Sequence, residues 1–172
     1  KRQVFEYTEK FDGTKLTADT VLVTEAEIEE AYEKVEPKLL DVIKKAIVNI
    51  RDFHQKQKQN SWFDTQENGI LLGQKVTPLA RCGVYVPGGK AVYPSSVLMN
   101  IVPAHVAGVK EIIMVTPPGR DGKVNPNTLV AAKEAGAQRV YKVGGAQAIA
   151  ALAFGTETIP KVDKICLLYT SP

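Results

Sequence analysis

Apolar residues recur at helical spacing in the first part of this chain and form short continuous runs in the second. One helical set predicts a helix that starts at Pro37 and buries one face; its members are Leu39, Leu40, Ile43, Ile47, Ile50 and Phe53. From Pro78 onward, short apolar runs alternate with helix-like segments. The pattern therefore predicts two regions, a helical segment with a hairpin over 1–77 and an alternating segment over 78–165.

Within the first region, turn and cap residues predict where each element begins. Residues 5–11 are typical of the tail of a helix, and residues 16–23 predict a short strand. Thr24 and Glu27 have the spacing of a capping box, in which hydroxyl and carboxylate satisfy each other's backbone donors. A helix is expected from there to about Val35.

Two short apolar stretches near residue 68 predict a β-hairpin. Residues 62–66 and 70–77 flank Glu67-Asn68-Gly69, and an Asn-Gly pair favours the tight turn that joins antiparallel strands.

The second region alternates strands and helices. The expected strands are Val84–Val86, Glu111–Thr116 and Arg139–Val143, and the expected helices are Ser95–Ala107, Asn127–Ala135 and Ala146–Phe154. The serines after Pro94 are expected to cap the first of these helices. This β-α-β-α-β-α order predicts an α/β protein with a parallel sheet, an incomplete Rossmann-like fold equal to half of a doubly wound nucleotide-binding domain.

Composition and charge narrow the class of protein. The chain has 172 residues, of which 44% are hydrophobic and 24% charged, as in ordinary globular domains. A formal charge of +3, spread along the chain, gives no indication of nucleic-acid binding, and the longest apolar run is too short for a membrane span. Two cysteines make no disulfide framework and fit a reducing, cytoplasmic compartment.

Two glycine turns are candidates for a ligand site. Pro87-Gly88-Gly89 and Gly144-Gly145 are each followed by a helix start, and both should lie at the carboxyl edge of the sheet, where ligands collect. Tyr85 offers a ring and a hydroxyl, and Gln147 offers an amide that both donates and accepts. The spacing does not follow the dinucleotide fingerprint, and a half-buried structural tyrosine is the alternative for Tyr85.

Other polar residues give no candidate for catalysis or metal binding. His54 is expected to face solvent, His105 to lie on or pack against a helix, and Cys82 to belong to the core. Two isolated histidines do not make a zinc site. The glutamates of the second helix are expected to form a solvated acidic face; they are Glu25, Glu27, Glu29, Glu30, Glu33 and Glu36. We therefore assign no catalytic residue and no metal ligand within the chain.

Two long blocks resemble the histidinol dehydrogenase family. They are Tyr-Val-Pro-Gly-Gly-Lys-Ala with Pro-Ser-Ser-Val-Leu-Met-Asn (residues 85–100), and Val-Gly-Gly-Ala-Gln-Ala-Ile-Ala-Ala-Leu-Ala-Phe-Gly-Thr-Glu with Pro-Lys-Val-Asp-Lys-Ile (residues 143–165). By this resemblance Tyr85 and Gln147 match residues that contact NAD. Lys161, Asp163 and Lys164 match the second block and receive no chemical role.

The resemblance implies an enzyme that oxidises L-histidinol through the aldehyde to L-histidine with two NAD molecules. It also implies a zinc ion that holds the substrate and a Glu-His pair for proton transfer, all downstream of this chain, so the chain is expected to be an inactive N-terminal part. The whole protein is expected to be a homodimer in the cytoplasm, or in a plastid if a transit peptide has been lost. The alternatives are a sister dehydrogenase with another hydroxyl substrate and a non-catalytic packing or dimerisation domain.

The last residues depart from the family pattern. After Ile165 the family continues with Gly-Pro-Gly-Asn, whose Asn is a third NAD contact, whereas this chain reads Cys-Leu-Leu-Tyr-Thr-Ser-Pro. We interpret 166–172 as a non-native junction, with a divergent strand over 165–169 as the alternative.

Overall fold

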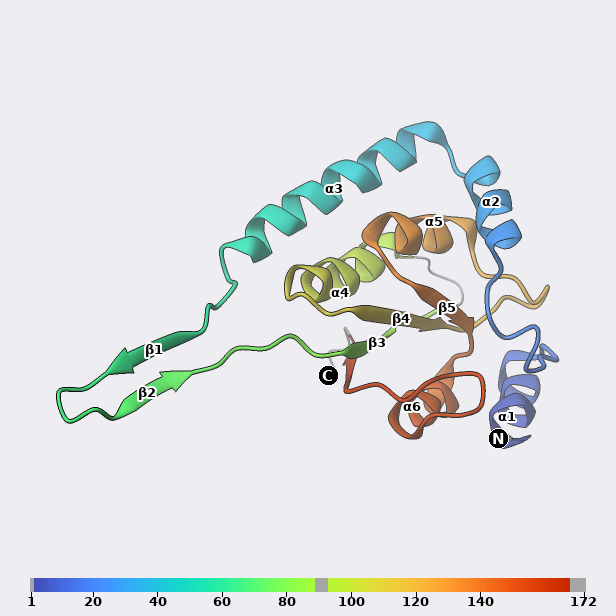
Figure 1. Cartoon of the computed structure of the whole chain (residues 1–172). Coiled ribbons are helices and arrows are strands. Elements are labelled where there is room, and N and C mark those ends of the chain that lie inside the picture. The colour runs from blue at the N-terminus through green and yellow to red at the C-terminus, as the bar shows by residue number, and fades with distance from the viewer. Residues whose placement is uncertain (1, 89–92, 168–172) are drawn as a thin grey trace, which may run out of the picture.

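A parallel four-stranded sheet forms the centre of the molecule (Figure 1). The structure is a computed structural model and describes residues 2–88 and 93–167. The strand order is β5 (Arg139–Lys142), β4 (Glu111–Thr116), β3 (Arg81–Tyr85) and β6 (Lys164–Leu167). All three neighbouring pairs are parallel, which confirms the predicted α/β sheet. β6 takes in Cys166 and Leu167; residues 168–172 of the expected junction lie outside the described residues.

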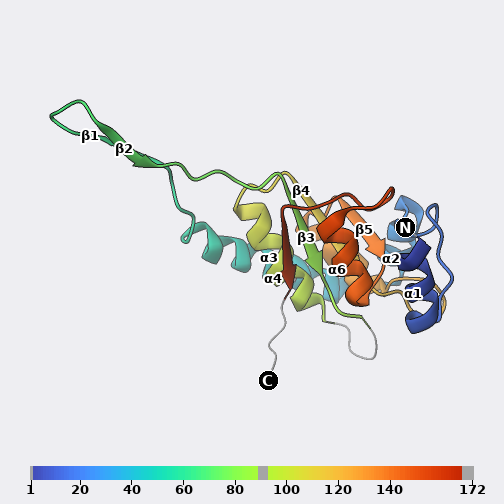
Figure 2. The same cartoon turned by 90° about the horizontal axis from the view of Figure 1, so that it is seen from below.

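Helices cover both faces of this sheet (Figures 1 and 2). α4 (Pro94–Val106) and α5 (Pro126–Ala135) lie on one face, with α2 (Glu25–Lys34) and α3 (Pro37–Gln55) packed outside them. α6 (Gly145–Phe154) lies on the other face and packs against α1 (Arg2–Asp12).

Side chains of β4 alternate between the two cores. Ile112 and Met114 join the core under α4 and α5, whereas Ile113 and Val115 join the core under α6. All four are completely buried, as expected for a strand inside a sheet that is covered on both faces.

The helix starts confirm one predicted cap and correct another. The Thr24 hydroxyl accepts a hydrogen bond from the Glu27 backbone at 3.2 Å, and the Glu27 carboxylate accepts one from the Thr24 backbone at 2.9 Å, so the capping box is present. The serine cap expected for α4 was wrong: α4 begins at Pro94 with Tyr93 as its N-cap and no side-chain cap bond. Proline suits the first helical position because its φ is preset and its missing N–H would be unpaired there.

The strand expected over 16–23 was also wrong. This segment makes an isolated bridge, Leu22 to Tyr141, at the outer edge of β5. Two backbone hydrogen bonds accompany it: Val23 N–H donates to the Val140 carbonyl, and Lys142 N–H donates to the Val21 carbonyl. A turn bends the backbone just before this contact, with Val21 donating to the Thr17 carbonyl, so few residues can follow β5.

The predicted hairpin is present and projects from the body (Figures 1 and 2). β1 (Trp62–Thr65) pairs antiparallel with β2 (Leu71–Gln74). Gly69 has φ +82° in the turn, and the Asn68 side chain accepts a hydrogen bond from the Ile70 backbone. We call residues 61–76 the arm; the Ser61 hydroxyl and the Val76 backbone close its base.

Across the described ranges, no helix combines the length and apolar character needed to cross a membrane.

Candidate functional site: the carboxyl edge of the sheet

Tyr85 and Gln147, the two predicted site residues, meet at the start of α6. Tyr85 is the last residue of β3, and the turn after β5 leads into α6 at Gly145. The Tyr85 hydroxyl accepts a hydrogen bond from the Gly145 backbone N–H at 3.1 Å, which ties the end of β3 to the first turn of α6. Parallel strands end at the same sheet edge, so residues 60 positions apart become neighbours.

Glycine is favoured at position 145 of this corner for two reasons. Its φ of +65° lies in the left-handed region that side chains rarely adopt. A Cβ at this position would also lie 2.6 Å from the Gln147 Oε1 atom, so the flexible end of that side chain would have to move. The Gln147 side chain therefore folds back toward Gly145, whose backbone N–H bonds the Tyr85 hydroxyl.

The Gln147 side chain is buried without a hydrogen-bond partner. Only 8% of the residue is exposed, and its amide makes no hydrogen bond with any of the residues that the structure describes. An unpaired buried amide costs roughly 1–3 kcal/mol, so such a group is uncommon unless a ligand or water completes it. The Gly144 N-cap supplies no side chain either, which leaves the helix start open to an acceptor.

The other glycines of the two turns pack against protein. A Cβ on Gly88 would lie 2.7 Å from Pro117 Cγ, and one on Gly144 would lie 2.5 Å from Pro117 Cβ. Pro117 follows β4 and sits between the two turns. At Gly88 and Gly144, the group that approaches the glycine backbone closely is the Pro117 ring and not a ligand. Gly89 lies outside the described residues.

A cavity that the sequence did not predict has Pro117 in its wall. It measures about 300 Å³ and is lined by the loop between β4 and α5, with Gly88 and the α5 start at Asn125 on its wall and Lys34 and Lys123 contributing cationic side chains. The Pro-Pro-Gly run after β4 and the Asn-Pro start of α5 were the available signals.

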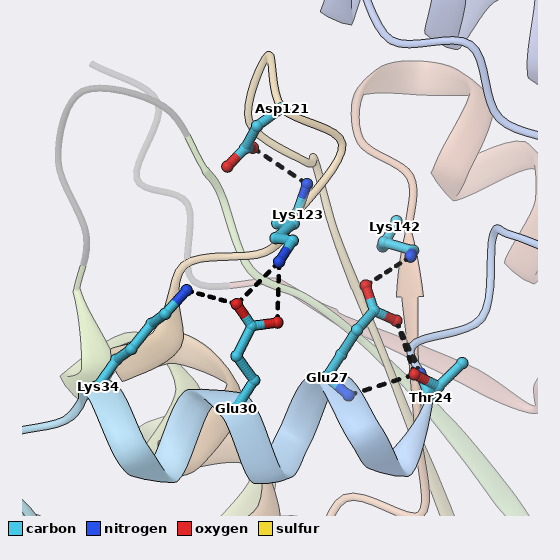
Figure 3. Close-up of polar contacts among 7 residues, drawn as sticks. All are labelled: Thr24, Glu27, Glu30, Lys34, Asp121, Lys123 and Lys142. Atoms are coloured by element: carbon cyan, nitrogen blue, oxygen red, sulfur yellow. Dashed lines mark hydrogen bonds and ion pairs between the residues drawn. The ribbon is translucent and has the colours of Figure 1, made fainter.

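A network of charged residues ties α2 to this edge (Figure 3). Glu30 pairs with Lys34 at 2.5 Å and with Lys123 at 2.8 Å, and these hydrogen bonds lower the pKa of Glu30 to about 2. The Lys142 amine, with 8% of its side chain exposed, donates to Glu27 at 2.8 Å. Burial alone would raise the pKa of Glu27, but the hydrogen bonds from Lys142 and Thr24 lower it.

The expectation of a solvated acidic face is therefore wrong for part of α2. Glu27 pairs with Lys142 of β5 and Glu30 pairs with Lys123 of the loop before α5, and both are partly buried because α2 packs on α5. Glu25 pairs with Lys133 of α5 but its side chain stays 75% exposed, as expected.

The remaining candidates lie apart from the corner. His105 is exposed near the end of α4, and His54 is half-buried near the end of α3, where its ring bonds Gln57. Cys82 is buried in the core, as predicted; contact with Cys166, Sγ to Sγ at 3.5 Å, and burial raise its pKa. Within residues 2–88 and 93–167 no three His, Cys, Asp or Glu side chains cluster as a metal site.

Nearly the whole chain is similar in sequence to known proteins of one family. The model of the histidinol dehydrogenase family matches residues 1–166. Histidinol dehydrogenase from Bacillus subtilis is 59% identical over 162 residues, which cover 94% of this chain and 38% of the relative. The enzyme from Geobacillus kaustophilus is 58% identical over 160 residues, covering 93% and 37%.

A crystal structure shares the fold. Histidinol dehydrogenase from Elizabethkingia anophelis matches with a TM-score of 0.89 at 41% identity, over 95% of this chain and 37% of that one. The chain thus spans less than two fifths of the length of these relatives. Since the family model covers almost every residue, including Tyr85 and Gln147, the chain belongs to the histidinol dehydrogenase family.

Proposed function

We propose that this chain supplies part of the NAD site of a histidinol dehydrogenase, with Tyr85 and Gln147 as cofactor contacts. The observation that carries the proposal is the buried Gln147 amide, which has no partner among the described residues and lies close to Gly145, the residue that bonds the Tyr85 hydroxyl. The complete protein would oxidise L-histidinol through the aldehyde to L-histidine, as a cytoplasmic homodimer.

The residues at the corner suit the chemistry of NAD. The cofactor combines aromatic rings, ribose hydroxyls and a pyrophosphate. The Gln147 amide can pair with a hydroxyl or a ring nitrogen, the Tyr85 ring gives an apolar surface, and the first turn of α6 favours negative charge. Bound there, NAD would supply the hydride acceptor, while this chain would bind and orient it.

Zinc does not fit the described part of the chain, because no three ligand-type side chains come together there. We place the zinc ligands and the Glu-His pair in the part of the protein that this chain does not span. The chain alone is then expected to give no histidinol-dependent NADH.

The test is an NAD titration of the complete protein by calorimetry, with Gln147→Leu and Tyr85→Phe. Each variant removes polar groups and keeps the size of the side chain, and each should weaken NAD binding about tenfold, as expected when a buried hydrogen bond is lost. Matched controls are Gln55→Leu on α3 and Tyr7→Phe on α1, both exposed. Unchanged affinity in both site variants would refute the cofactor assignment.

A further inference from the structure

Two buried threonines line the cavity between β4 and α5. Thr116, the last residue of β4, is 2% exposed, and Thr128, in the first turn of α5, is 5% exposed. Neither side-chain hydroxyl makes a hydrogen bond with any residue of 2–88 or 93–167. Both residues lie on the wall of the same 300 Å³ cavity as Pro117, which we call the Pro117 cavity. Since the large majority of buried hydroxyls are paired, two such groups on one cavity indicate that a polar ligand completes them.

The position of Thr128 in its helix explains why its hydroxyl is left over. A threonine inside a helix can bond the carbonyl four residues earlier, as Thr8 does with Val4 at 2.9 Å. Thr128 lies in the first turn of α5, and the residue four positions earlier, Val124, precedes the helix. The hydroxyl is therefore available to a group in the cavity.

The backbone at the start of α5 offers a further donor. The Asn125 side chain accepts a hydrogen bond from the Asn127 N–H at 2.9 Å, and the Asn125 carbonyl accepts one from the Leu129 N–H. The Thr128 N–H has no acceptor within the described ranges. Together with the positive end of the helix dipole, this donor favours a negatively charged group at the start of α5.

Lys34 and Lys123 bring cationic groups to the same wall (Figure 3). Lys34 donates one hydrogen bond to Glu30 and Lys123 donates at most two, so each ammonium keeps at least one N–H donor. The Asp121 carboxylate also lines the cavity and accepts a bond from the Lys123 backbone. Two lysines against Glu30 and Asp121 leave no net charge, which suits a small anion better than a polyanion.

We propose that the Pro117 cavity binds a phosphate group. The Thr116 and Thr128 hydroxyls and the first turn of α5 would donate to its oxygens, and the two lysines would balance its charge. Helix N-termini and lysines are recurrent parts of phosphate sites. A volume of about 300 Å³ is at the small end for ligand sites, so the group belongs to a small phosphate ester, is free phosphate, or is the pyrophosphate of NAD.

This site goes beyond the proposed function and does not rest on it. None of its donors is Tyr85, Gly145 or Gln147, the residues of the NAD corner. Substitutions at Tyr85 and Gln147 should therefore leave the binding of inorganic phosphate unchanged, which separates the failure of one proposal from the failure of the other.

The test titrates the chain with inorganic phosphate at constant ionic strength, followed by NMR. Chemical shifts should change at the backbone N–H of Thr128 and Gly119. Thr116→Val and Thr128→Val keep the size and branching of the side chain, and each should weaken phosphate binding about tenfold, as expected when a bond to a charged acceptor is lost. Thr8→Val, a buried site outside the cavity, is the matched control and should bind as the parent does.

Thermal unfolding separates a binding role from a structural one. Without phosphate, Thr116→Val and Thr128→Val should unfold at the temperature of the parent or above it, because an unpaired hydroxyl contributes no hydrogen bond. Phosphate should raise the unfolding temperature of the parent, and raise that of the two variants less. Glu30→Gln should act in the opposite direction and tighten phosphate binding severalfold, because it releases both lysines.

Competition identifies the source of the phosphate group. NAD that displaces inorganic phosphate would assign the site to the pyrophosphate of the cofactor, and NAD that leaves it in place would assign the site to a separate phosphate ester or free phosphate. Absence of phosphate binding, or equal affinity in the parent and in both threonine variants, would overturn the proposal.

Discussion

The sheet and the arm are built from similar apolar stretches and use them in opposite ways. In β4 the run Ile-Ile-Met-Val is completely buried between two helical layers. In the arm, Trp62-Phe63 and Ile70-Leu71-Leu72 are about half exposed or more. The difference is one of context, because α4, α5 and α6 cover the sheet and none of the described elements covers the arm. An apolar stretch therefore reveals the kind of element, while its burial depends on what the rest of the molecule supplies.

The two regions are expected to differ most in how much the free energy of unfolding falls when a large apolar side chain is shortened to alanine. Ile113→Ala leaves a cavity in the core under α6 and should lower the free energy of unfolding by about 2–5 kcal/mol. Leu71→Ala on the arm should change it by less than about 0.5 kcal/mol at concentrations where the chain is monomeric. Chemical denaturation followed by circular dichroism measures both, and equal losses would contradict the contrast.

The next largest effect is expected at the partly buried ion pair between Glu27 and Lys142, which joins α2 to β5. Glu27→Gln leaves the Lys142 amine buried beside a neutral amide and weakens the capping box, so we expect a loss of about 2 kcal/mol in the free energy of unfolding. Glu33→Gln, an exposed residue of the same helix, is the control and should be near neutral. Similar small effects from both substitutions would mean that the Glu27 contact contributes little.

A smaller and local effect is expected at the tip of the arm. Gly69 has φ +82°, so Gly69→Ala should destabilise the hairpin by roughly 1–2 kcal/mol. Because every residue of β1 and β2 is exposed, unfolding of the sheet should not change. Hydrogen exchange should therefore quicken at the backbone N–H of Gln66, which bonds Ile70, and stay constant in β4. Quickening in both regions would show that arm and body are coupled.

The smallest effect concerns pH. The folded-state pKa of Glu30 is about 2, below its ordinary value of 4.5, because of Lys123 and Lys34. The folded state therefore binds this proton less readily than the unfolded state, and the stabilisation is complete above about pH 4.5 and lost as pH falls toward 2. The Glu30 side chain is 38% exposed, so the effect is screened by salt. Glu30→Gln should make the fall in stability over this range shallower, and an unchanged slope would refute the contribution.

Local signals in the sequence predicted most elements, and contacts distant in sequence explain the failures. The Thr24 capping box, the Asn68-Gly69 turn and the apolar run of β4 each depend on neighbouring residues and were confirmed. The strand expected over 16–23 failed because its only sheet partner is the edge of β5, more than a hundred residues away.

The candidate site shows the same limit. Parallel topology was enough to predict that Tyr85 and Gln147 would share a sheet edge. That Gly88 and Gly144 accommodate Pro117, and that Glu27 pairs with Lys142, depends on loop packing, for which the sequence carries no local pattern.

The most direct test of the central claim, that Tyr85, Gly145 and Gln147 form an NAD-binding corner, is an NMR titration of the 18.8 kDa chain with millimolar NAD. We predict chemical-shift changes at the Gly145 backbone N–H and the Gln147 side-chain amide, and none at the arm residues. Shifts confined to other residues, such as those around the cavity between β4 and α5, or no shifts at all, would contradict the account.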